Sequence, residues 1–126
     1  MLELTTDLWS ILLPSEWEAE QDDETIIIVD EDEASIIEIT PLFPEKGKTV
    51  TSLLNECVKG DVRKTTLSEL PAFYHEFEDD GMFWREWYCD AGKFVLIVSH
   101  GADIANKNMD DAAVDELLST LLLIEA

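Results

Sequence analysis

Basic residues are scarce in this sequence. It holds 8 Lys and Arg residues against 29 Asp and Glu residues, a formal net charge of −21 over 126 residues, and no base precedes Lys46. A field of this sign repels phosphate backbones and anionic lipid but attracts basic proteins and cations. We therefore expect a basic protein partner, and we expect neither a nucleic-acid nor a membrane partner.

Export and membrane-anchoring signals are also missing. The N-terminal segment has no basic residue and is interrupted by Asp7 and Pro14, unlike a signal peptide. No apolar run approaches the roughly 20 residues that span a bilayer. The two cysteines, Cys57 and Cys89, match no metal-binding or redox spacing, which favours reduced, buried thiols. We expect a cytoplasmic protein and assign it no oligomeric state.

Motifs for catalysis and for cofactor or metal binding are absent from the sequence. It contains no G-x-S-x-G, no H-E-x-x-H and no glycine-rich phosphate loop. Ser99 and His100 are neighbours on a predicted strand, so their side chains leave opposite faces and cannot form a nucleophile–base pair. The acidic run that begins at Asp30 fails the calcium-loop template at Ala34 and Ser35. We predict no enzyme, no cofactor and no specific metal site.

The sequence does contain a pattern of short strands and two helices, and no linker or repeat interrupts it. Strands are predicted at residues 9–13, 16–21, 25–30, 34–40, within 61–70, and at 72–79, 82–90 and 93–100. One helix starts at Thr49 or Thr51, and the other starts at Asn108 or Asp110 and runs through Leu122. We predict one α+β domain over residues 1–126, an antiparallel sheet of about six to eight strands with two main helices packed on it. The apolar strand at 94–98 is expected at its centre.

The element order resembles a known family. A Trp-x-Ile-x-Leu-Pro-x-x-Trp opening, from Trp9 to Trp17, precedes an acidic hairpin, a helix, three aromatic strands and a Leu-rich helix. This order is similar to that of the PsbP-like superfamily, which includes small bacterial proteins of unassigned role. The resemblance implies the fold and a tendency to bind other proteins. It brings no catalytic motif and no functional residue.

Residues 16–24, EWEAEQDDE, carry six carboxylates and no base. On a strand, the alternating acids share one face, with Trp17 and Ala19 on the other. Such charges either protect a sheet edge from aggregation or form a docking surface whose self-repulsion a basic partner offsets. The candidate partner-binding acids are Glu16, Glu18, Glu20, Asp22, Asp23 and Glu24.

Eight aromatic residues fall within residues 73–94. Core packing accounts for such a cluster, but so does a partly exposed binding surface. In the second case Trp84, with Tyr74, reaches solvent beside Arg85 and Glu86, a composition typical of protein-binding hot spots. We therefore add Trp84 and Arg85 to the candidate partner-binding residues.

These features predict a small acidic protein-binding domain. In a bacterium, such a domain suggests an immunity protein or inhibitor that covers a basic site on its partner. The alternative is an accessory or chaperone-like subunit of a larger assembly, in which the charge only keeps the domain soluble. A hydrolase with an unrecognised site is the least favoured alternative.

Overall fold

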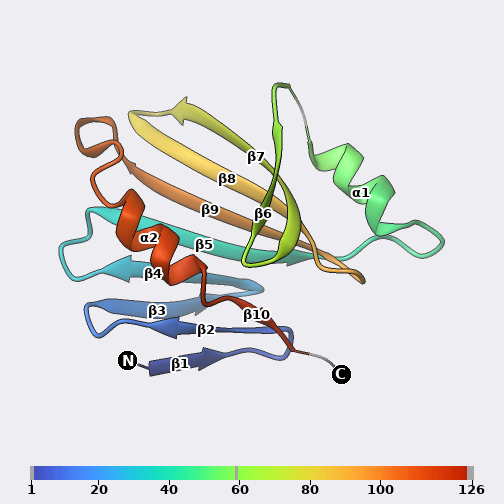
Figure 1. Cartoon of the computed structure of the whole chain (residues 1–126), viewed down its shortest axis with the longest axis horizontal. Coiled ribbons are helices and arrows are strands. Elements are labelled where there is room, and N and C mark those ends of the chain that lie inside the picture. Colours follow the sequence, from blue (N-terminus) through green and yellow to red (C-terminus); the bar gives the residue numbers. More distant parts are fainter. Residues whose placement is uncertain (1, 59, 125–126) are drawn as a thin grey trace.

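The fold is built around a seven-stranded antiparallel sheet, shown in the computed structural model (Figure 1). The structure describes residues 2–58 and 60–124. The strand order is β3-β4-β5-β9-β8-β7-β6, so β3 and β6 are the two edges and β9 is central. The strands are β3 (Trp17–Asp22), β4 (Thr25–Asp30), β5 (Ser35–Leu42), β6 (Arg63–Leu67), β7 (Leu70–Asp79), β8 (Met82–Asp90) and β9 (Val95–Asp103).

A second, three-stranded sheet packs against the first. Its central strand β2 (Trp9–Leu13) pairs with β1 (Leu2–Thr5) and with β10 (Leu122–Leu123). Trp9, Ile11 and Leu13 point inward, are at most 3% exposed, and belong to the same hydrophobic cluster as the main sheet. The alternation of these residues predicted β2 correctly, whereas β1, β10 and the separate small sheet were not predicted.

One face of the seven-stranded sheet, called the core face below, carries the hydrophobic core. A row of cross-strand neighbours on this face consists of Ile26, Ile39, Val98, Trp87 and Tyr74. All five are at most 8% exposed. The helix α2 (Asp111–Leu118) lies over this face in Figure 1, and its three buried apolar residues join the same cluster.

The opposite face, called the outer face below, is covered at one end by α1 (Val50–Cys57), which contacts β8 and β9. The buried Leu54 of α1 lines a hollow together with Phe73 and Asp90 of the outer face. Thr49 begins the helix, because its side chain accepts a hydrogen bond from the N–H of Ser52. This helix start is one of the two that the sequence predicted.

The predicted α+β class is confirmed, with strands dominating, and β9 is the central strand as expected. The prediction that the last helix runs through Leu122 is wrong. The helix ends at Leu118, because Leu122 and Leu123 pair with β2 instead. The strand β5 also continues beyond the predicted stop at Pro41, over a stretch where β4 no longer pairs with it.

Candidate functional site

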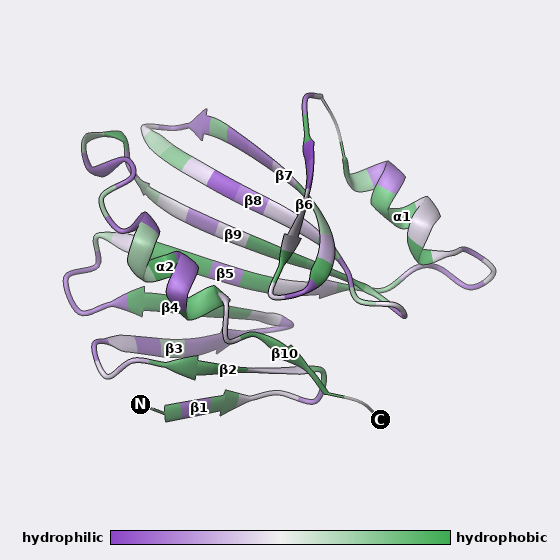
Figure 2. Cartoon of the chain, in the orientation of Figure 1, coloured by the Kyte–Doolittle hydropathy of each residue, from purple (hydrophilic) through white to green (hydrophobic). Residues whose placement is uncertain are grey.

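The strand β3 is an acidic edge of the seven-stranded sheet. Within the described residues it pairs with β4 alone, and Figure 2 shows the hydrophilic β3 beside the hydrophobic β4. Trp17 points to the core face and is 7% exposed, as predicted. The exposed acids of the other face are Glu16, just before the strand, and Glu18, Glu20 and Asp22 within it. Ala19 was expected to pack inward but is exposed, because it borders a cleft lined by Leu4 and Thr5.

Further acids lie at both ends of β3. Asp23 and Glu24 form the exposed turn to β4, and Asp23 takes a left-handed conformation with a φ of 55°. At the other end, the N–H of Glu31 donates to the carbonyl of Glu16 over 2.9 Å. This bond places the acidic turn between β4 and β5 beside the start of β3. The acids of residues 16–24 and 31–33 therefore form one continuous negative edge.

The outer face continues from this edge across the sheet in two rows of cross-strand neighbours. One row consists of Glu20, Ile27, Glu38, Ser99, Glu86 and His75. The other consists of Glu18, Val29, Ile36, Gly101, Trp84 and Phe77. The apolar side chains of both rows are half-buried. The acids of β3 therefore share one face with a half-exposed apolar and aromatic surface, which includes the predicted Trp84. We call these two sets the outer-face rows.

Glu86 is the polar centre of the outer-face rows. Its Oε1 lies 2.9 Å from His75 Nε2 and also accepts a hydrogen bond from the Tyr88 hydroxyl, while Ser99 donates to Oε2 over 2.9 Å. Burial raises the pKa of Glu86, but the hydrogen bonds from these three side chains outweigh burial and bring the pKa below its usual value. Glu86 is therefore an ionised carboxylate, and its one ion-pair contact among the described residues is to His75.

Aromatic rings surround this carboxylate. The ring centroid of His75 lies 5.6 Å from that of Tyr88 and 5.2 Å from that of Phe77. The Phe77 ring is 6.4 Å from that of Trp84 and nearly parallel to it. Trp84 in turn covers Gly101, where a Cβ atom would lie only 2.6 Å from the indole ring. The glycine thus allows the Trp84 ring to lie flat on β9.

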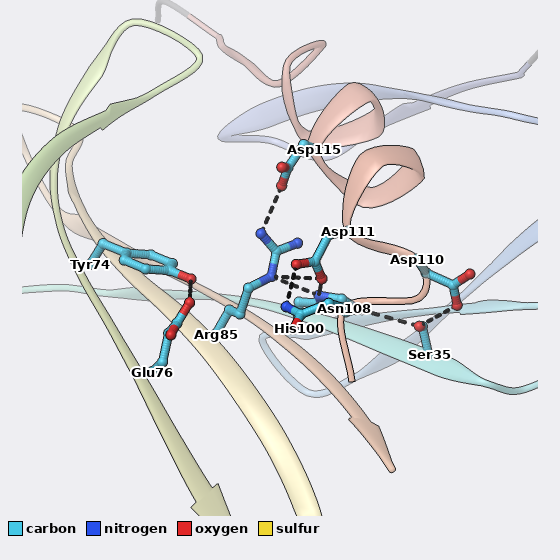
Figure 3. Close-up of polar contacts among 9 residues, drawn as sticks. All are labelled: Ser35, Tyr74, Glu76, Arg85, His100, Asn108, Asp110, Asp111 and Asp115. Atoms are coloured by element: carbon cyan, nitrogen blue, oxygen red, sulfur yellow. Dashed lines mark hydrogen bonds and ion pairs between the residues drawn. The ribbon is translucent and has the colours of Figure 1, made fainter. Parts of the chain in front are cut away.

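The structure places Arg85 on the core face, which contradicts its predicted exposure beside Trp84. Arg85 is 6% exposed, and Tyr74 is 8% exposed. Figure 3 shows the guanidinium between β8 and α2, where Nη1 donates to Asp115 over 2.9 Å and Nε donates to His100 over 3.1 Å. Neighbouring residues of a strand alternate between faces, so Trp84 and Arg85 cannot serve one surface. Arg85 is therefore removed from the candidate partner-binding residues.

Arg85 instead belongs to a polar cluster that fastens α2 to the sheet. Ser35 donates to Asp110 over 2.6 Å and lies 3.3 Å from His100 Nε2 (Figure 3). His100 is 4% exposed, and burial, followed by the charge of Arg85, lowers its pKa to about 4. Asp110 and Asp111, at the start of α2, oppose this shift. The cluster holds a neutral imidazole between a cation and a hydroxyl.

Sequence reasoning missed Glu86, His75 and Tyr88 as a group. The available signal was their spacing, because His75 and Glu86 each lie two residues from aromatic residues on both sides and therefore share a face with them. His75 lies on the outer face, whereas Cys89 and His100 lie on the core face. The described residues contain no group of three or more His, Cys, Asp or Glu arranged to hold a metal ion. No helix in the described part of the chain has the length and apolarity to cross a membrane.

Comparison with known proteins gives a fold but no family. No family model and no curated protein matches the chain. A crystal structure from Bacteroides thetaiotaomicron matches with a TM-score of 0.70 at 15% identity, over 93% of this chain and 45% of that one. The chain thus spans less than half of that protein. The solution structure of cyanobacterial PsbP (CyanoP) from Synechocystis matches with a TM-score of 0.64 at 8% identity, over 98% of this chain and 92% of that one. The fold-level resemblance to PsbP inferred from the sequence is confirmed.

Proposed function

We propose that this domain binds a basic protein through the acidic edge β3 and the outer-face rows, as an immunity protein or inhibitor that covers a cationic site on its partner. The observation that carries the proposal is the register of the sheet. It sets the acids Glu18 and Glu20 on the same face as Trp84, Phe77 and other half-exposed apolar side chains. Charges that steer and rings that anchor are the two components of a protein-binding surface.

The concentration of charge supports a partner more than edge protection. One or two charges are enough to protect a sheet edge from aggregation. Here six acids in residues 16–24 adjoin three more in residues 31–33, and these segments contain no base. Like charges held together repel each other, and a cationic partner surface offsets that repulsion. The arrangement is therefore better suited to attracting a partner than to repelling neighbouring strands.

Glu86 supplies an anchor within the apolar part of the surface. Its carboxylate is held by His75, Tyr88 and Ser99 among aromatic rings, and it makes no ion pair with Lys or Arg in the described part of the chain. A Lys or Arg side chain from a partner would find there an ionised oxygen pair and the faces of Phe77 and Trp84. Half-buried positions of this kind are where binding free energy concentrates.

The test measures association kinetics. A basic partner is first isolated from native lysate at low salt, and its association with the domain is followed by stopped-flow fluorescence. Changing Glu16, Glu18 and Glu20 to Gln should slow association roughly tenfold or more at low salt, because steering depends on long-range charge. Dissociation should change less, and the effect should shrink at high salt as screening shortens the field.

A matched control removes the same charge elsewhere. Asp61→Asn, Glu69→Gln and Glu116→Gln together neutralise three exposed acids near β6 and on α2, none of which belongs to β3 or its flanking turns. This variant should associate nearly as fast as the wild type. Equal slowing in both variants would attribute the effect to net charge and refute the assignment of β3. Capture of a multisubunit assembly in place of one basic protein would favour the accessory-subunit alternative.

A further inference from the structure

A cleft of about 490 Å³ lies on the core side, at the end of the sheet opposite β3. Its floor is formed by Tyr74 of β7 and by Arg85 and Trp87 of β8. Arg63 and other residues of β6 line one wall, and Asp115 of α2 lines the other. The volume falls in the range of about 300 to 1,000 Å³ that is typical of sites for small organic ligands.

Arginine and aromatic side chains lie next to one another along the floor and one wall of the cleft. The guanidinium carbon of Arg63 lies 5.0 Å from the centre of the Tyr74 ring. The Tyr74 and Trp87 ring centroids are 5.1 Å apart, and the Arg85 guanidinium carbon lies 5.0 Å from the Trp87 ring. These contacts hold each guanidinium group beside an aromatic ring. A guanidinium that can bind a carboxylate therefore lies next to aromatic rings that can contact the apolar part of the same ligand.

Arg85 has unused hydrogen-bonding capacity. Its side chain is 7% exposed, and its buried Nη2 makes no hydrogen bond within the described residues. Nε donates to His100 and lies 3.4 Å from an Asp111 carboxylate oxygen, so these two residues fix the position of the guanidinium. Nη1 donates to Asp115, whose side chain is 58% exposed and therefore able to exchange this bond for hydration.

The lining of the cleft carries more bases than acids, although the molecule is acidic. Three of the eight bases of the chain, Arg63, Lys64 and Arg85, line the cleft, together with one acid, Asp115. The acids of β3 lie toward the opposite edge, four strand spacings or roughly 19 Å along the sheet from β8, which carries Arg85. That distance is about two screening lengths at physiological salt. Salt therefore screens most of the effect of the β3 acids on this cleft.

We propose that this cleft binds a small organic anion, with its carboxylate on Arg85 in competition with Asp115 and its flat apolar part against Tyr74 and Trp87. Arg63 closes the far end of the cleft and adds a second positive charge. A planar guanidinium binds a carboxylate through paired N–H donors, which a lysine cannot reproduce. The binding is independent of the docking surface on the outer face, because the two lie on opposite sides of the sheet.

The test is a benzoate titration of isotope-labelled protein at constant ionic strength, followed by the NMR signals of the Arg85 Nε–H and the Trp87 indole N–H. We expect saturable shifts at both signals and weaker binding of acetate, which lacks the ring. Arg63→Gln should weaken benzoate binding roughly three- to fivefold, the scale of one exposed charge. Asp115→Asn should tighten it by a similar factor, because the variant removes the competing carboxylate.

Lys93→Gln is the matched control, because Lys93 is an exposed base in the turn before β9, outside the cleft lining. This variant should bind benzoate as the wild type does. Absence of saturable shifts in the folded wild type would overturn the proposal. So would equal weakening by Arg63→Gln and Lys93→Gln, because that result reports only net charge. The opposite signs expected for Arg63→Gln and Asp115→Asn distinguish binding in the cleft from diffuse attraction of anions.

Discussion

Lowering the pH from 7 to about 4 should destabilise the domain through His100. The imidazole is 4% exposed, and its Nδ1 accepts a hydrogen bond from Arg85 Nε over 3.1 Å. Accepting this bond requires the neutral ring, whose remaining proton on Nε2 faces the Ser35 hydroxyl. Protonation would place a positive charge beside the Arg85 guanidinium in a buried position, and the pKa of His100 is accordingly lowered to about 4.

The magnitude follows from the difference in proton binding between the two states. The unfolded chain takes up a proton at His100 near pH 6.5, whereas the folded protein resists protonation down to about pH 4. Between these values the unfolded state binds more protons, so the free energy of unfolding falls as the pH falls. This difference in the pKa of His100 corresponds to a loss of roughly 3 kcal/mol in the free energy of unfolding. The loss is complete once the pH is below the pKa of the folded protein.

Urea unfolding of the wild type and His100→Gln at several values between pH 7 and 4 would measure this effect. Gln cannot titrate, but its amide can accept from Arg85 and donate to Ser35. Carboxylates common to both proteins contribute equally, so the difference in unfolding free energy isolates His100. Between pH 7 and 4, the free energy of unfolding should fall by roughly 3 kcal/mol more in the wild type than in His100→Gln. Parallel pH profiles for the two proteins would refute the argument.

Two further predictions concern neighbouring parts of the sheet. Gly101→Ala places a methyl group 2.6 Å from the Trp84 ring, so it should destabilise the domain by about 1 to 3 kcal/mol in urea unfolding and shift tryptophan fluorescence to longer wavelength; an unchanged spectrum and midpoint would contradict the close packing of ring on glycine. Cys57 should react with a thiol reagent in the native protein, whereas Cys89, which is fully buried and has its pKa raised to about 12, should react only after unfolding; equal native rates would contradict the burial of Cys89.

Local alternation predicted much of the fold and part of the candidate site. It placed Trp17 opposite the acids of β3, and it separated Ser99 from His100. The two-residue period of a strand shows which side chains share a face, but it does not show which face of the sheet is buried. For this reason Arg85 was expected at the surface, although α2 covers it.

Other features depend on contacts between distant segments. The end of α2 is set by the pairing of Leu122 with Ser10 of β2. The helical spacing of the apolar residues before Leu122 cannot predict that pairing. The Glu86 cluster is set by the register that aligns His75, Glu86 and Ser99 on three strands. A register is a property of pairs of strands, so no single segment of the sequence reveals it.

The alternation along β8 also limits how the length of this chain can change. Trp84 and Glu86 serve the outer face, while Arg85 and Trp87 serve the core face beneath α2. One residue gained or lost inside β8 would exchange the two sets, burying an indole where the guanidinium now pairs and exposing the arginine among the aromatic rings. We expect insertions to be tolerated instead in the turns that flank β8, including the hairpin turn at Gly81. Related chains should therefore vary in length at these turns and keep β8 at constant length.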